Sequence, residues 1–165
     1  MYRTADVLLL SASDLVGYLE CEHLTQLERR AALGEIKRPV RVDPALDLVA
    51  SLGDEHERKH LDRYQASGLS VFVVEQRGNA PDDLRLAEAD TSDAMRRGVD
   101  LIYQATFFDG RWTGRADFLI KVAEPSRLGS HGYEVVDAKL ARHAKTRALL
   151  QVAIYSDQLA RLQGL

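Results

Sequence analysis

The spacing of hydrophobic residues predicts that the chain begins with helices. Residues 13–34 carry leucines at near-helical intervals after a Ser-Asp capping pair, which favours a first helix. A second helix is expected over 44–67, because proline is tolerated in a first turn and Gly68 follows directly. Both segments precede any strand-like pattern, so residues of about 13–68 form a predicted helical part.

Strand-like spacing dominates the rest of the chain. The turn signal Asp109-Gly110 separates two runs rich in β-branched and aromatic residues and so predicts a hairpin. The predicted strands are 71–74, 101–108, 111–122 and 133–140, and the remaining predicted helices are 84–97 and 145–162. On the last helix we expect the core-facing residues to be Leu149, Val152, Ala153, Ser156 and Leu159. This order predicts an α/β fold of two or three layers, with a mixed β-sheet flanked by helices.

Composition is consistent with one domain that spans residues 1–165. A hydrophobic content of 45% suffices for a sizeable core at this length. Only one cysteine, Cys21, is present, so no internal disulfide can form, which suits a reducing compartment. The apolar run 7–10 is far shorter than the roughly 20 residues of a membrane span, and nothing resembles a signal peptide. We therefore expect a cytoplasmic protein with no membrane partner.

The formal net charge of −3 argues against a generally basic surface that coats nucleic acid. Contacts with DNA would have to be local. Basic residues gather in two places, just before Asp117 and just after Lys139. The residues expected to contact nucleic acid there are Arg115, Arg142, Lys145 and Arg147. Such runs are often plain solvated surface, which is the alternative.

Three acid-x-Lys sequences occur, and strand periodicity distinguishes one of them. The match at 35–37 falls at the end of a predicted helix, and the match at 57–59 falls inside one, where residues two apart point away from each other. Asp137 and Lys139 fall on a predicted strand, where residues two apart project from the same face. Only this match is expected to bring both charged groups to one site. The alternative is an ordinary ion pair between them.

Asp117 offers a second carboxylate within a predicted strand, where acidic residues are uncommon. Its alternative role is an ion pair with Arg115 or Lys121. Two carboxylates from adjacent strands could hold Mg²⁺ or Mn²⁺, hard cations that prefer carboxylate and water oxygens. Such an ion would stabilise charge on a phosphodiester under attack, and Lys139 would ease deprotonation of the attacking water. The pattern favours metal-dependent hydrolysis.

The order of Gly-x-x-Asp at 114–117, Asp-x-Lys at 137–139 and Gln-x-x-x-Tyr at 151–155 resembles the PD-(D/E)XK nuclease superfamily, and in particular its RecB-like branch. It looks most similar to bacterial RecB-like nucleases in which the nuclease region precedes a helicase-type region. The resemblance implies a restriction-endonuclease-like core over about 69–165, after an N-terminal helical segment over about 13–68. Because relatives continue with further strands or a partner domain, we expect either a chain truncated at its C-terminus or a short stand-alone protein.

The same resemblance implies roles for individual residues. It gives the metal ligands as His56, Asp117, Asp137 and the carbonyl oxygen of Ala138, the catalytic lysine as Lys139, and the residues that orient DNA or that lysine as Gln151 and Tyr155. The upstream ligand has an alternative, because many members separate the motif's glycine and histidine by three residues. Here two residues separate Gly53 from His56, so Glu57 stands where that histidine would be. His56 could also simply pair with His60.

The implied activity is that of a Mg²⁺- or Mn²⁺-dependent deoxyribonuclease, acting as an exonuclease or on single strands and ends, in DNA repair, recombination or defence. A helicase domain or subunit is an expected partner. Some relatives bind an iron-sulfur cluster through one upstream and three downstream cysteines; Cys21 has no downstream companion, so no cluster is expected. The alternatives are an inactive nuclease-fold module that binds nucleic acid or a helicase, and a generic α/β protein whose acids form ordinary ion pairs.

Overall fold

A four-stranded mixed β-sheet forms the centre of the computed structural model, which describes residues 1–4, 7–40, 42–141, 143 and 145–165. The strand order is β3-β4-β5-β6, with β3 parallel to β4 and the other neighbours antiparallel. The strands are β3 (Val71–Val73), β4 (Leu101–Phe108), β5 (Thr113–Val122) and β6 (Gly132–Val136). The predicted α/β fold with a mixed sheet flanked by helices is confirmed.

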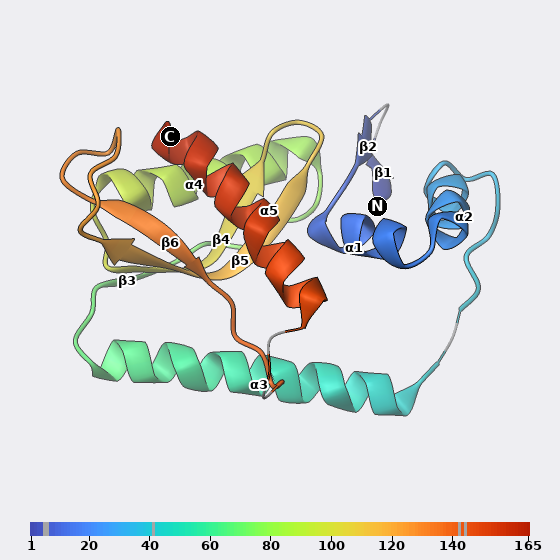
Figure 1. Ribbon diagram of the computed structural model, residues 1–165, viewed down its shortest axis with the longest axis horizontal. Helices are drawn as coiled ribbons and strands as arrows, with labels where there is room; N and C mark the ends of the chain where they lie inside the picture. The colour runs from blue at the N-terminus through green and yellow to red at the C-terminus, as the bar shows by residue number, and fades with distance from the viewer. Residues whose placement is uncertain (5–6, 41, 142, 144) are drawn as a thin grey trace.

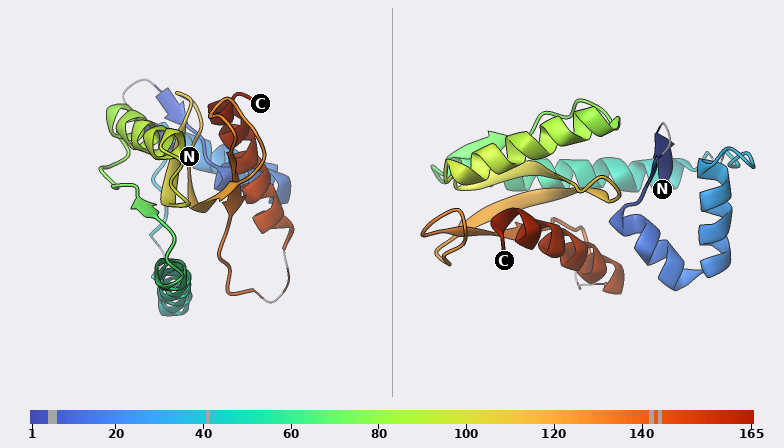
Figure 2. Two further views of the ribbon diagram at one scale, coloured as in Figure 1. Left: turned by 90° about the vertical axis from the view of Figure 1, so that its left-hand side faces the viewer. Right: turned by 90° about the horizontal axis from the view of Figure 1, so that it is seen from above.

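Helices cover both faces of this sheet and make three layers (Figures 1 and 2). Two helices, α4 (Pro81–Arg96) and α5 (Thr146–Gln163), lie over one face, and α3 (Pro44–Ala66) runs along the other. Ile102 and Leu119, paired across β4 and β5, belong to the buried cluster formed with α4 and α5. On the opposite face the ring of Tyr64 in α3 packs against Phe118, with centroids 5.4 Å apart.

The helix α3 agrees with its predicted bounds to within one residue. Asp43 caps its first turn by accepting from the backbone N–H groups of Ala45 and Leu46. None of its residues is fully buried. The half-buried residues in its second half recur at helical spacing and are Gly53, His56, Glu57, His60, Leu61 and Tyr64. This face is turned to the sheet, because it includes Tyr64, which contacts Phe118 of β5.

The N-terminal region differs from the single predicted helix. A hairpin of β1 (Tyr2–Thr4) and β2 (Val7–Leu9) comes first, followed by α1 (Ala12–Glu20) and α2 (Glu22–Ala32). The break between these helices is Cys21, which has an extended backbone and accepts from the Leu24 N–H through its Sγ at 3.4 Å. Cys21 is exposed. None of the helices in the described part of the chain combines the length and apolar character needed to cross a membrane.

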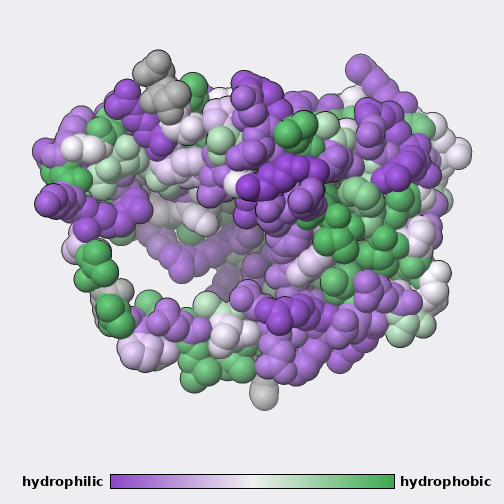
Figure 3. Space-filling model, turned by 180° about the vertical axis from the view of Figure 1, so that it is seen from behind, coloured by the Kyte–Doolittle hydropathy of each residue, from purple (hydrophilic) through white to green (hydrophobic). Residues whose placement is uncertain are grey.

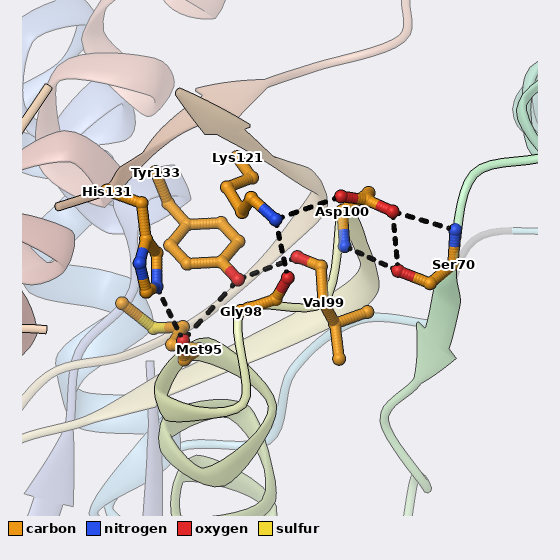
Figure 4. A network of polar contacts seen from close by, with 8 residues as sticks. All are labelled: Ser70, Met95, Gly98, Val99, Asp100, Lys121, His131 and Tyr133. Atoms are coloured by element: carbon orange, nitrogen blue, oxygen red, sulfur yellow. Dashed lines mark hydrogen bonds and ion pairs between the residues drawn. The ribbon is translucent and has the colours of Figure 1, made fainter. Parts of the chain in front are cut away.

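A polar network pins the end of the sheet where β6 begins (Figure 4). The Tyr133 hydroxyl donates to the Val99 carbonyl at 2.6 Å, and Lys121 Nζ lies 3.0 Å from Asp100 Oδ1. Asp100 Oδ2 also accepts from the backbone and hydroxyl of Ser70, at 3.0 and 2.6 Å. The Ser70 hydroxyl and N–H, with Lys121, lower the pKa of Asp100 to about 2. The turn into β4 is thereby tied to β3 and β5, at the end of the sheet away from the carboxylates described next.

Candidate active site

Asp137 and Lys139 lie just beyond the end of a strand. β6 ends at Val136, so the prediction that this strand continues to residue 140 is wrong. The physical reason is a competing acceptor: the Ala138 N–H donates to Asp117 Oδ2 at 2.8 Å instead of to a strand backbone. Lys139 Nζ nevertheless lies 2.8 Å from Asp137 Oδ1. The two charged groups meet, as predicted, but in an irregular segment after β6 and not through strand alternation.

The carboxylate of Asp137 is nearly enclosed, with 4% of its side chain exposed, whereas Lys139 is 42% exposed. Their contact is an ion pair without the angles of a hydrogen bond, because the buried Asp137 Oδ1 has no hydrogen-bond partner among the described residues. A buried carboxylate is costly unless a cation or hydrogen-bond donors lie against it, and here the Lys139 ammonium does so. The predicted alternative, a Lys–Asp ion pair, is therefore present.

Asp117 on β5 is the most strongly perturbed acid of this group. Burial raises the pKa of its carboxyl to about 7; the Ala138 N–H opposes this rise, and the charges of Asp137 and Glu57 add to it. Lys139 also lowers the pKa, with a smaller effect. Acids that raise one another's pKa in a half-buried place are stabilised by a bound cation. This arrangement is typical of functional sites as well as of some structural ion-pair networks.

Glu57 reaches the carboxylates from α3. Its Oε1 accepts from the Gln104 side chain, and it also forms a hydrogen bond with the Tyr103 hydroxyl. Burial first, and then Glu57, raise the pKa of Tyr103 to about 12. His56, the first choice for the upstream ligand, instead faces His60, with 3.3 Å between their Nε2 atoms. The structure thus brings the alternative, Glu57, into electrostatic contact with Asp117.

Gln104 is a site residue that the motifs of the sequence do not include. Its φ of 56° is the only positive value at a non-glycine residue in the described chain. The residues on either side of it, Tyr103 and Ala105, pair with Phe118 and Ala116 of β5. Gln104 therefore lies across from Asp117, at a position where the pairing of β4 with β5 is interrupted. Strained backbone of this kind concentrates at functional sites. The available sequence signal was a long amide side chain within the strand-like run 101–108, which is otherwise made of aliphatic, aromatic and β-branched residues.

Tyr155 approaches β5 closely because position 114 is glycine. A Cβ atom at Gly114 would overlap the Tyr155 ring, which is 7% exposed. Gln151 Nε2 donates to the Tyr155 hydroxyl at 3.4 Å, so the two side chains lie together on α5, as their spacing predicts. Burial raises the pKa of Tyr155, with further contributions from Asp117 and Asp137. Tyr155 therefore lies within electrostatic range of both acids.

A cavity of about 560 Å³ opens beside Asp137, between the segment after β6 and the start of α5. Its charged lining residues are Asp137, Lys139, Lys145 and Arg147; His143 and Gln151 also line it, and its apolar residues include Leu140, Leu149 and Val152. Arg147 also pairs with Glu20 of α1, at 2.6 Å. On the opposite side of the molecule, Figure 3 shows a separate hollow above α3 that is bordered mostly by hydrophilic side chains. The cavity beside Asp137 is a basic cavity next to a pair of acids.

Arg115, one of the residues predicted to contact nucleic acid, lies away from this cavity. The Arg115 guanidinium donates to Asn79 Oδ1 at 3.2 Å and to the Gly78 carbonyl at 3.4 Å, so it holds the loop before α4. Arg142 lies outside the described residues. Lys145 and Arg147 remain as the placed candidates.

The oxygen atoms available as metal ligands fit a hard divalent cation. Asp117 and Asp137 offer carboxylate oxygens from two buried or half-buried side chains, and oxygen ligands suit Mg²⁺ or Mn²⁺. No group of three or more His, Cys, Asp or Glu side chains converges on one point within the described ranges. Two carboxylates therefore form the centre of the site, and Glu57 acts on them through its charge.

Comparison of the chain with protein-family models, with curated proteins and with solved structures finds no match. The geometry of these residues and the resemblance of their motifs therefore carry the functional argument.

Proposed function

We propose that this protein is a Mg²⁺- or Mn²⁺-dependent nuclease with a restriction-endonuclease-like core, which hydrolyses phosphodiester bonds in DNA. One observation supports this proposal most strongly. Asp117 is tied to the segment after β6 through the Ala138 N–H, and burial together with the charges of Asp137 and Glu57 raises its pKa to about 7. A divalent cation would offset the negative charge that burial and these neighbouring acids disfavour.

The metal would be held by Asp117 and Asp137, with the Ala138 carbonyl and Glu57 as further ligands, since Glu57 and not His56 is in electrostatic contact with Asp117. When bound, it would stabilise negative charge on the phosphate and lower the pKa of a water molecule. Asp137 and Asp117 raise the pKa of Lys139 against the effect of its burial, so its ammonium stays charged at neutral pH. From its half-exposed position, this ammonium would donate to a phosphate oxygen or to the attacking water.

The polar groups on α5 would position the substrate. Lys145 and Arg147 line the cavity beside Asp137 and would contact backbone phosphates, which bind local basic groups even on an acidic protein. Gln151 and Tyr155 would orient the Lys139 side chain or the DNA strand, since Tyr155 is in electrostatic contact with that lysine. The cavity is a pocket on one side of the sheet, which favours single strands or strand ends over a continuous duplex.

Cleavage of end-labelled single-stranded and duplex DNA in Mn²⁺ or Mg²⁺ tests the proposal. Asp137→Asn and Lys139→Ala should each reduce the rate by at least about 100-fold with an unchanged circular dichroism spectrum, because each removes transition-state stabilisation. Lys59→Ala is the matched control, since Lys59 also follows an acid-x-Lys pattern but forms an exposed pair with Glu55. Wild-type rates in both site variants would contradict the proposal.

A second candidate is a nuclease-fold module that binds nucleic acid or a helicase without cleaving DNA. It is favoured by the absence of a third converging ligand within the described ranges, and by the Lys139 ammonium that already compensates Asp137. Calorimetric titration with Mn²⁺ distinguishes the two. Saturable binding that Asp117→Ala removes supports the nuclease, whereas retained DNA affinity without Mn²⁺ binding supports the module.

A further inference from the structure

Two imidazole groups meet on α3 beside the carboxylates but are not directed at them. His56 and His60 lie one helical turn apart on the half-buried face, with their ring centroids 4.7 Å apart and their planes at 80°. Their Nε2 atoms are 3.3 Å apart. Between them in sequence, Glu57 points to Tyr103 and Gln104. The histidine pair and the carboxylates thus form two separate groups of potential ligands.

The distance between the two nitrogens is the one that a metal ion would require. Zinc binds imidazole nitrogen at about 2.0–2.1 Å with tetrahedral geometry, which places two such nitrogens roughly 3.3 Å from each other. Two histidines at positions i and i+4 of one helix are a known way to bind zinc. A direct N–H···N hydrogen bond is the alternative, although 3.3 Å is longer than most hydrogen bonds donated by N–H.

We propose that His56 and His60 together bind a borderline transition-metal ion, of the class of Zn²⁺, Co²⁺ or Ni²⁺, at a site distinct from Asp117 and Asp137. Imidazole nitrogen suits these ions, whereas carboxylate and water oxygens suit Mg²⁺ and Mn²⁺. No third His, Cys, Asp or Glu joins the pair within the described ranges, so water would complete the coordination. The site does not depend on the proposed nuclease activity.

Titration of the full-length, untagged protein with CoCl₂ and ZnCl₂, in a large excess of Mg²⁺, tests this site. Calorimetry and the visible absorption of bound Co²⁺ should both show one saturable site, with Ni²⁺ binding more tightly than Co²⁺. His56→Ala and His60→Ala should each weaken binding at least about tenfold, since loss of a ligand costs no less than loss of a supporting group. Circular dichroism checks that each variant keeps its helices.

Two controls separate this site from the other histidines and from the carboxylates. His23→Ala changes an exposed histidine on α2 and should leave Co²⁺ affinity unchanged. Asp117→Asn should also leave it unchanged, whatever that variant does to DNA cleavage. Absence of a saturable site, or unchanged affinity in His60→Ala, would overturn the proposal. Loss of Co²⁺ binding in Asp117→Asn would overturn it as well, because the ion would then be bound by the carboxylates.

Discussion

Replacing Asp117 with asparagine should stabilise the metal-free protein above pH 7. Burial raises the pKa of this carboxyl from 3.8 to about 7, so the folded state holds a proton that the unfolded chain releases near pH 4. The favourable contribution is complete below pH 4 and is lost as the pH rises through about 7. At pH 8 the folded protein carries a buried charge that asparagine lacks. The side-chain amide oxygen of the variant can still accept from the Ala138 N–H.

The magnitude follows from the size of this pKa difference. A rise in pKa from 3.8 to about 7 corresponds to a loss of at most about 4 kcal/mol in the free energy of unfolding at high pH, at about 1.4 kcal/mol for each unit of pKa. Solvent screens part of the half-buried carboxyl, so we expect about 2 kcal/mol. For a protein of this length, that corresponds to a melting temperature higher by about 4–8 °C. A variant that loses a metal ligand would thus gain stability.

Thermal unfolding of both proteins at pH 5 and pH 8, in EDTA, measures this effect. The gain should be full at pH 8 and less than half as large at pH 5, because the carboxyl of the unfolded chain is already mostly ionised at pH 5. The matched control is Asp100→Asn, an Asp→Asn change at the other end of the sheet where the pKa is lowered to about 2. Its ionised form contributes stability above pH 4 that is lost as the pH falls through about 2, so the variant should be less stable at pH 8, by at most about 1 kcal/mol. An unchanged or lower melting temperature for Asp117→Asn at pH 8 would refute the reasoning.

Three further substitutions test the arrangement around Asp117. Gly114→Ala should lower the free energy of unfolding, measured by urea denaturation, by about 1–3 kcal/mol, because the added Cβ overlaps the Tyr155 ring. This loss should be smaller when Tyr155 is also replaced by leucine. Gln104→Gly should keep or raise the melting temperature, since glycine tolerates a φ of 56°. The same variant should lower the rate of Mn²⁺-dependent cleavage at least about tenfold, because Glu57 loses the hydrogen-bond donor that positions it. Lys145→Ala should weaken DNA binding and reduce the salt dependence of log K by about 1 in a fluorescence anisotropy titration; an unchanged slope would remove this lysine from the interface.

The central elements of the fold could be predicted because their patterns are local. The bounds of α3 follow from a proline in its first turn and a glycine after its end, and β4 follows from its run of aliphatic, β-branched and aromatic residues. The β1–β2 hairpin was missed because each strand has three residues. Its position depends on tertiary contact, in which Leu9 packs with Leu84 and Phe108. No short-range pattern reports such a contact.

The predicted core face of α5 was partly wrong, for a reason connected with the site. Leu159 is buried as predicted and Val152 is half-buried, but Leu149, Ala153 and Ser156 are exposed. Tyr155 and Gln163 are buried instead. Gln163 is buried because its side-chain amide bonds both backbone groups of Tyr133, accepting at 2.6 Å and donating at 3.2 Å. Polar residues that are buried through specific hydrogen bonds distort a hydrophobic pattern. Apolar spacing alone therefore selects a face rotated away from the true one.

The candidate site was predictable in its residues more than in its geometry. The acid-x-Lys pattern correctly brought Asp137 and Lys139 together, although the strand that was expected to carry them ends earlier. The choice between His56 and Glu57 could not be made from spacing, because it depends on which side chain meets β4 across space. Gln104 supplies that contact, and its effect on Glu57 is visible only in three dimensions.

The most direct test of the central claim is anomalous diffraction from crystals equilibrated with Mn²⁺. The account predicts a Mn²⁺ peak within bonding distance of the carboxylates of both Asp117 and Asp137, and no such peak in the Asp117→Asn variant. A structure at saturating Mn²⁺ without a peak between these two carboxylates, with Lys139 still paired to Asp137, would contradict it.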